Sequence, residues 1–123
     1  MEPHAAGAIV VADDDSAVRL LCRVNLELEG YRVVEAADAR ELEDVVGRDD
    51  VAGVFLDIRL GEADGVALAR RMRKERPGLR VVFLSGSVER ADSLGELAEG
   101  FLAKPFSLEA LSESARQLAP PPA

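Results

Sequence analysis

Four short, predominantly apolar runs constrain this chain most strongly, because each one leads into a polar side chain that is capable of chemistry. The runs cover residues 8–12, 51–56, 79–84 and 100–103, and the residues that directly follow them are Asp13, Asp57, Ser85 and Lys104. Runs of this length that are rich in β-branched residues are typical of buried strands. Ligands bind outside the carboxyl ends of the strands in an open parallel sheet. The sequence therefore predicts an acidic pocket with one lysine and one hydroxyl.

Stretches with apolar residues at helical spacing separate the strands, and a further strand of mixed polarity is expected at residues 31–36. The helices are predicted between Asp15 and Gly30 and over residues 38–46, 65–76, 89–99 and 108–118. Their expected buried faces are Val18, Leu21, Cys22 and Leu28, then Leu42, Val45 and Val46, then Val66, Leu68, Ala69 and Met72, and finally Leu108, Leu111, Ala115 and Leu118. Asp15 or Ser16, Asp64 and Ser107 are suited to cap three of these helices. Residues 47–50 are expected to form a turn and residues 58–64 a loop.

Five strands that alternate with five helices indicate an α/β fold of the flavodoxin-like (βα)5 type, a doubly wound parallel sheet with helices on both faces. The strand order most compatible with this length is 2-1-3-4-5, with right-handed crossovers and a short fourth helix. Residues 1–7 are expected to be a tail, residues 8–118 a single domain and residues 119–123 a Pro-rich tail or linker. Aspartates rather than a glycine-rich turn follow the first strand, which argues against a dinucleotide site or a Walker-type phosphate loop.

Charge and composition narrow the classes of function. The 123 residues carry a formal net charge of −8, which argues against direct binding to nucleic acid or to an anionic membrane surface. No apolar stretch approaches the roughly 20 residues that span a bilayer, so no membrane insertion is expected. No signal peptide precedes the first strand, and the expected compartment is cytoplasmic. Cys22 is the single cysteine, which leaves no disulfide framework and no thiolate metal site.

Asp13, Asp14 and Asp57 are expected to lie together at the ends of two adjacent strands. Carboxylates packed into one pocket repel one another unless a cation intervenes. A site with only oxygen ligands favours a hard divalent cation, and Mg²⁺ is the cellular default. An aspartate in such a site can also attack phosphorus and form an aspartyl phosphate. Lys104 and the hydroxyl of Ser85 are suited to offset the charge of the transferred group.

With these residues in place, the chain resembles the receiver domain of response regulators in two-component signalling. The resemblance extends over about residues 7–118. The matching elements, each at a strand end or a helix start, are Asp13-Asp14, Asp57, Asp64-Gly65, Ser85-Gly86 and Lys104-Pro105-Phe106. Each element alone is weak evidence, whereas all of them together and in this order are highly specific for the family.

The resemblance implies that Asp57 accepts a phosphoryl group from a histidine kinase or a histidine phosphotransfer protein. The expected Mg²⁺ ligands are Asp13, Asp14, Asp57 and the backbone carbonyl of Arg59. The hydroxyl of Ser85 would donate a hydrogen bond to the phosphoryl group, and Lys104 would pair with it. The resemblance also implies a cis peptide bond between Lys104 and Pro105. Phe101 is expected to be an aromatic switch, whose ring turns inward when the Ser85 hydroxyl moves toward phosphate.

Some features depart from the family pattern. Gly61 and the residue before it stand where the family usually has a Met-Pro pair, and Gly61 is expected to make this loop more mobile. Arg59 and Ser87 lie at positions that are expected to tune dephosphorylation. The side chain of Arg59 would either shield the phosphoryl group or pair with Asp13. The segment from Ser85 to Lys104 is shorter than in most relatives, which leaves open whether the fourth helix serves as an output face.

The leading hypothesis is a phosphorylation switch that changes its affinity for a partner, rather than an enzyme. Two alternatives stay open. One is a phosphate-independent, receiver-like interaction module. The other is a small Mg²⁺-dependent aspartyl-phosphate phosphatase, which would need a second aspartate two residues after the nucleophile, where this chain has Arg59. The sequence identifies neither the output partner nor whether the chain is a single-domain regulator or part of a larger protein.

Overall fold

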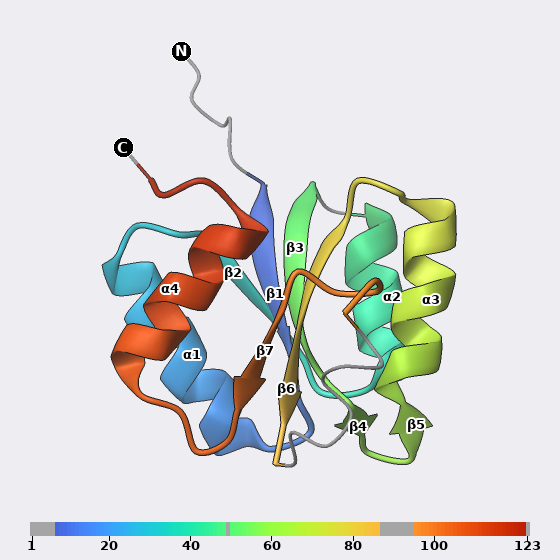
Figure 1. Cartoon of the computed structure of the whole chain (residues 1–123), viewed down its shortest axis with the longest axis horizontal. Coiled ribbons are helices and arrows are strands. Elements are labelled where there is room, and N and C mark those ends of the chain that lie inside the picture. The colour runs from blue at the N-terminus through green and yellow to red at the C-terminus, as the bar shows by residue number, and fades with distance from the viewer. Residues whose placement is uncertain (1–6, 49, 87–94, 123) are drawn as a thin grey trace.

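A five-stranded parallel sheet forms the centre of the computed structural model (Figure 1). The structure describes residues 7–48, 50–86 and 95–122. The strands of the sheet are β1 (Ala8–Ala12), β2 (Val33–Ala36), β3 (Val51–Asp57), β6 (Arg80–Ser85) and β7 (Gly100–Ala103). Their order is β2-β1-β3-β6-β7, and every pairing is parallel. Because β4 (Arg59–Leu60) and β5 (Ala63–Asp64) form a separate hairpin, this order confirms the predicted 2-1-3-4-5.

The central strands are apolar because helices cover both of their faces, whereas the edge strand β2 is mixed. Every residue of β1 is fully buried, while Val34 and Glu35 of β2 are half-buried. The strand expected at residues 31–36 begins later than predicted. The backbone N–H of Tyr31 donates to the carbonyl of Leu26 in the preceding helix (3.1 Å), so Tyr31 belongs to the turn that ends that helix.

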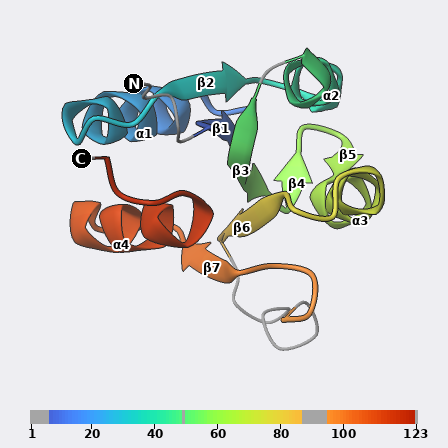
Figure 2. The same ribbon diagram turned by 90° about the horizontal axis from the view of Figure 1, so that it is seen from above.

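In the described part of the chain, two helices cover each face of the sheet (Figure 2). On one face lie α1 (Ser16–Leu28) and α4 (Leu108–Leu118), and on the other lie α2 (Ala39–Arg48) and α3 (Gly65–Glu75). The predicted caps are confirmed, since Asp15, Asp64 and Ser107 each accept a hydrogen bond from a backbone N–H of the first turn. None of these described helices has the length and apolar character needed to cross a bilayer.

The predicted buried faces are confirmed for α2 and α3 and are partly wrong for α1 and α4. Leu21 and Leu28 are 43% and 80% exposed, while Cys22 and Leu26 are fully buried. Since an α-helix turns by about 100° per residue, Leu28 points roughly 200° away from Leu26, and Leu21 points roughly 100° away from Cys22. Leu108 is 51% exposed because it lies in the first turn of α4, at the rim of the sheet.

Two further segments differ from the prediction. The expected loop over residues 58–64 contains the hairpin strands β4 (Arg59–Leu60) and β5 (Ala63–Asp64), whose tight turn uses a positive φ of 61° at Gly61. The expected turn at residues 47–50 begins later, because Gly47 and the next residue extend α2. The helix expected over residues 89–99 is not formed in residues 95–99, and the rest of it, like Ser87, lies outside the described residues.

Side-chain contacts explain why residues 95–99 do not form a helix. Arg73 of α3 donates to the carbonyl of Leu97 (2.8 Å). The backbone N–H of Glu99 donates to the carbonyl of Val81 (2.8 Å), and the carboxylate of Glu99 accepts from the N–H of Val81 (2.6 Å). Glu99 therefore continues the pairing of β6 with β7, and residues 95–97 before it form a turn.

The segment after α4 packs back on the domain. Ala119 is buried in the same hydrophobic cluster as α1 and α4. A Cβ added to Gly30, which has a φ of 97°, would lie 3.0 Å from the Cβ of Pro122. At least this part of the Pro-rich segment therefore covers the turn between α1 and β2.

The thiol of Cys22 is expected to be nearly inert in the folded protein. Its side chain is fully buried, and burial raises its pKa to about 12, with the charge of Asp13 acting in the same direction. An unfolded thiol has a pKa of about 8.5, so at pH 8 the thiolate fraction of the unfolded protein is about a thousandfold larger than that of the native protein. A disulfide reagent at pH 8 should thus modify the native protein far more slowly than the urea-unfolded protein. Equal rates in the two states would contradict the buried position of Cys22.

Candidate functional site

Four strand ends that are neighbours in the sheet carry the polar residues singled out in the sequence. Asp13 follows β1, Asp57 ends β3, Ser85 ends β6 and Lys104 follows β7. The backbone N–H of Lys104 donates to the carbonyl of Ser85 (2.8 Å) and holds the last two of these strand ends together. Asp13, Asp57 and Ser85 are only 0%, 9% and 8% exposed. The sheet topology therefore brings these residues together at one edge of the sheet, as the sequence predicted.

Lys104 joins two of the acidic residues, because its ammonium group reaches across the sheet from the edge strand. Its Nζ donates to Oδ2 of Asp13 at 2.6 Å and to Oδ2 of Asp57 at 2.9 Å. Burial lowers the pKa of the Lys104 ammonium, but the hydrogen bonds to the two carboxylates and their negative charges together raise it by more, so the net shift is upward. Lys104 therefore stays protonated and offsets part of the negative charge in the pocket.

Backbone N–H groups hold the other oxygen of each of these carboxylates. Oδ1 of Asp57 accepts from the N–H of Arg59, and Oδ1 of Asp13 accepts from the N–H of Asp15, both at 2.9 Å. Each carboxylate is thus held at both of its oxygens and has a defined orientation. Burial nevertheless raises the pKa of Asp13, and the hydrogen bonds from Lys104 and Asp15 reverse only part of this shift. The pocket therefore still favours additional positive charge.

Asp14 completes an acidic cluster with Asp13 and Asp57. One carboxylate oxygen from each residue can be chosen so that all of them lie within 4.8 Å of one another. Asp13 is buried and Asp14 is exposed, so the cluster opens to solvent on the side of Asp14. Carboxylate oxygens are the donors that hard divalent cations prefer, and Mg²⁺ commonly keeps several waters beside one or two carboxylates. The donor set and its open side therefore fit a hydrated Mg²⁺ ion.

The other residues predicted for the site lie around this pocket. Phe101 of β7 is half-buried, and its ring packs against Phe83 with a centroid distance of 5.5 Å. Arg59 is exposed, and within the described contacts Asp13 pairs with Lys104 rather than with Arg59. The pairing of Arg59 with Asp13, one of its two expected roles, is therefore not formed. The peptide bond before Pro105 is cis.

Comparison with known proteins places this pocket in a family. The sequence model described as response regulator receiver domain matches residues 9–116, which is most of the chain. The chain belongs to the response regulator receiver domain family. Such receiver domains are the signalling modules of two-component systems, and this assignment confirms the resemblance that the strand-end motifs indicated.

The receiver domain is similar to curated proteins and to solved structures. It is 38% identical over 113 residues to response regulator MprA of Mycolicibacterium vanbaalenii, covering 89% of this chain and 49% of that protein. The receiver domain of NtrX from Brucella abortus has a TM-score of 0.80 and 37% identity over 89% of this chain and 97% of that one. TrrA from Thermotoga maritima, solved in complex with Mg²⁺ and BeF, has a TM-score of 0.82 and 25% identity over 90% and 97%. The chain thus spans half or less of the length of MprA and of other curated relatives.

Sequence reasoning recognised the Asp64-Gly65 pair of the receiver domain but not the reason for its glycine. Gly65 begins α3, and its N–H donates to the carbonyl of Ile58 (2.7 Å). A Cβ at this position would lie 2.2 Å from the carbonyl oxygen of Asp57 and 2.9 Å from that of Ile58. The glycine therefore allows the start of α3 to touch the backbone of the strand end that carries Asp57. No local pattern reveals this contact, because it joins two separate elements.

Sequence reasoning also missed Arg19 of α1. Its Nη1 donates to the backbone carbonyl of Asp13 (2.8 Å), and its Nε donates to Glu35 of β2 (3.0 Å). The available signal was an arginine in the first turns of the helix that follows the acidic pair. That signal is weak, because Glu35 is 16 residues away and on another strand.

A Gly65→Ala substitution should destabilise the receiver domain and disturb the end of β3. The added methyl group collides with backbone atoms that cannot rotate away, so we expect a loss of about 1–3 kcal/mol in the free energy of unfolding. Urea denaturation followed by circular dichroism measures this loss.

Gly47→Ala is the matched control, because Gly47 lies in α2 and a Cβ there would meet no atom within 4 Å. This variant should be unchanged or more stable by about 0.5–1 kcal/mol, because alanine favours helix. Equal effects of the two substitutions would contradict the close approach at Gly65.

Proposed function

We propose that this receiver domain is a phosphoacceptor switch in which Asp57 receives a phosphoryl group with the help of Mg²⁺. The observation that carries this proposal is the double contact of Lys104, whose ammonium lies between the carboxylates of Asp13 and Asp57. A lysine in this position neutralises charge where a phosphoryl group bound to Asp57 would add more. The acidic cluster supports the same function, since its carboxylates fit a divalent cation.

The proposed donor is a phosphohistidine on a histidine kinase or a histidine phosphotransfer protein. A carboxylate oxygen of Asp57 attacks phosphorus, and the O–P bond forms as the P–N bond to the imidazole breaks. The bonding electron pair returns to the ring nitrogen, which takes up a proton from solvent. The protein mainly contributes positioning and charge in such a transfer. Asp57 is suited to this role because the Arg59 N–H and Lys104 already orient its carboxylate.

Asp13, Asp14, Asp57 and the backbone carbonyl of Arg59 would hold the metal ion. Bound Mg²⁺ would offset the negative charge that gathers on the phosphoryl oxygens. The ammonium of Lys104 would exchange part of its contact with Asp57 for the new phosphoryl oxygens, and the hydroxyl of Ser85 would donate a hydrogen bond to them.

The proposed readout of phosphorylation passes through Ser85 and Phe101. Ser85 pairs with Ala103 in the register of β6 and β7, and Phe101 packs on Phe83 across the same pair of strands. A shift of the Ser85 hydroxyl toward phosphate would therefore act directly on the strand that carries the Phe101 ring. The resulting change would alter affinity for an output partner, which is either a separate protein or another domain of a longer chain.

The rival phosphatase function has less support. An aspartyl-phosphate phosphatase needs a second carboxylic acid two residues after its nucleophile, and Arg59 occupies that position here. A guanidinium group holds its proton too strongly to act as a general acid for a leaving group at neutral pH. We therefore propose a signalling role with self-catalysed phosphorylation and dephosphorylation, rather than turnover of an external phosphate ester.

Incubation with acetyl phosphate and Mg²⁺ should add one phosphoryl group to the wild-type protein, as measured by intact mass. The Asp57→Asn variant should gain none, because an amide is not a nucleophile toward phosphorus. Omission of the metal should abolish or strongly slow the modification.

Asp50→Asn is the matched control, since Asp50 is exposed and directly precedes β3, whereas Asp57 ends the same strand. This variant should be modified like the wild type. An adduct that persists in Asp57→Asn would assign the acceptor elsewhere. Absence of an adduct with every phosphodonor would favour the phosphate-independent interaction module.

Arg59→Ala should shorten the lifetime of the phosphorylated form severalfold, as measured by loss of the adduct after the donor is removed. The exposed guanidinium two residues after the acceptor is proposed to shield the phosphoryl group from water. Arg70→Ala, which removes an exposed arginine from α3, should leave the lifetime unchanged. The same decay rate in Arg59→Ala and in the wild type would rule out the shielding role.

A further inference from the structure

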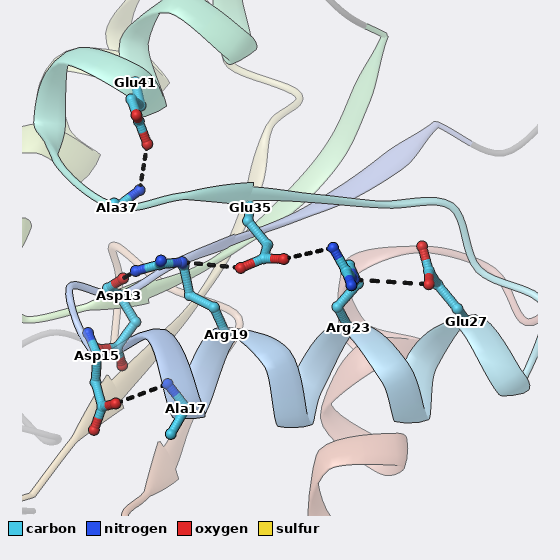
Figure 3. Close-up of polar contacts among 9 residues, drawn as sticks. All are labelled: Asp13, Asp15, Ala17, Arg19, Arg23, Glu27, Glu35, Ala37 and Glu41. Carbon is cyan, nitrogen blue, oxygen red and sulfur yellow. Dashed lines mark hydrogen bonds and ion pairs between the residues drawn. The ribbon is translucent and has the colours of Figure 1, made fainter.

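The loop that carries the acidic pair is tied to the neighbouring edge strand through one arginine side chain (Figure 3). Arg19 of α1 uses two sides of its guanidinium group at once. Its Nη1 donates to the carbonyl oxygen of Asp13 at 2.8 Å, and its Nε donates to Oε1 of Glu35 at 3.0 Å. The planar fork of an arginine can hold two acceptors in this way with a fixed angle between them.

The carboxylate of Glu35 is itself held from both sides, which restrains the arginine further. Its second oxygen, Oε2, accepts from Nη1 of Arg23 at 2.8 Å, one turn further along α1. The side chains of Arg19 and Glu35 are only 16% and 26% exposed, so water competes weakly for this contact. Arg23 is 41% exposed and has no contact with Asp13 among the described hydrogen bonds. The link to the acidic loop therefore passes through Arg19 and Glu35.

The carbonyl that Arg19 binds belongs to the peptide group between Asp13 and Asp14. This peptide orientation sets where the Asp14 side chain leaves the strand end and where the next N–H points. The N–H of Asp13 donates to Ala36 of β2 (3.1 Å), and the N–H of Asp15 donates to the carboxylate of Asp13 (2.9 Å). The Arg19 side chain adds an anchor at the carbonyl of this peptide group.

We infer that Arg19 is a positioning residue for the divalent-cation site and that Glu35 holds its guanidinium in place. The pair keeps the Asp13–Asp14 peptide in the orientation that presents both carboxylates to one ion. This inference rests on the proposed function, because it assumes that the acidic cluster binds Mg²⁺. Residues that orient metal ligands in this way typically contribute about 10- to 100-fold in metal affinity or activity.

Electrostatics and positioning predict opposite signs, which makes the inference testable. Removal of a positive charge near an acidic pocket should tighten the binding of a cation if charge alone matters. Loss of the anchor should weaken binding if Arg19 positions the loop. We therefore expect Arg19→Met to raise the dissociation constant for Mg²⁺ about tenfold, measured by NMR titration of backbone amides in the absence of any phosphodonor.

Arg23→Met is the matched control, since it removes the same charge from the same helix and one of the two arginine contacts to Glu35, but leaves both contacts of Arg19 in place. Its dissociation constant should stay within about twofold of the wild type or become smaller. Arg19→Lys should bind Mg²⁺ with an intermediate affinity, because an ammonium group keeps the charge but lacks the fork. If Arg19→Met does not fold, Arg19→Lys decides alone, because charge then predicts an unchanged dissociation constant whereas positioning predicts a larger one.

Hydrogen exchange without metal gives a second readout that a change in global stability alone would not reproduce. The amide of Asp15 should exchange faster in Arg19→Met than in Arg23→Met, compared at matched stability. Wild-type protein that binds no Mg²⁺ would overturn the proposed metal site itself. If the wild type binds Mg²⁺ normally and Arg19→Met has an unchanged or smaller dissociation constant, the positioning role alone is overturned. Equal weakening of Mg²⁺ binding in Arg23→Met and in Arg19→Met would also overturn the positioning role.

Discussion

The contact of one ammonium group with two buried carboxylates is the interaction on which the rest of this structure depends. Lys104 Nζ lies 2.6 Å from Asp13 and 2.9 Å from Asp57, and these acids belong to two different central strands. Burial of such charges is unfavourable, and the raised pKa of Asp13 shows that its pairing with Lys104 offsets only part of this cost. Because the lysine comes from the edge strand β7 and the acids from β1 and β3, the pocket exists only when the sheet has its complete order.

Around this contact the backbone does most of the positioning. The N–H groups of Asp15 and Arg59 orient the two carboxylates, and Gly65 lets α3 press directly against the strand end that carries Asp57. An acid that is already oriented loses little further freedom when a cation or a phosphoryl group arrives. The proposed acceptor role of Asp57 and the proposed anchoring role of Arg19 share this physical basis, in which orientation is established before the ligand binds.

Local pattern predicted most of the elements, and its errors have identifiable causes. Apolar runs predicted four of the five strands of the sheet, since strands covered on both faces can hardly tolerate polar residues, whereas the edge strand β2 has mixed polarity. Helical spacing failed at Leu21, Leu28 and Leu108, because spacing gives a periodic stripe but not the part of the helix that meets the sheet. The predicted fourth helix failed over residues 95–99 because Arg73 and Glu99 supply tertiary hydrogen bonds that propensity does not contain.

The sequence by itself determined which residues stand at strand ends, because strand and turn preferences act over a few neighbouring residues. It therefore predicted Asp13, Asp57, Ser85 and Lys104 as one site, and the family resemblance followed from their order. Only the tertiary structure decided which of these groups touch, since Lys104 and Asp13 are 91 residues apart along the chain. The same holds for the contacts of Arg19 with Glu35 and of Gly65 with Asp57. These contacts arise from the packing of helices on the sheet, and local sequence preferences do not determine which surfaces pack together.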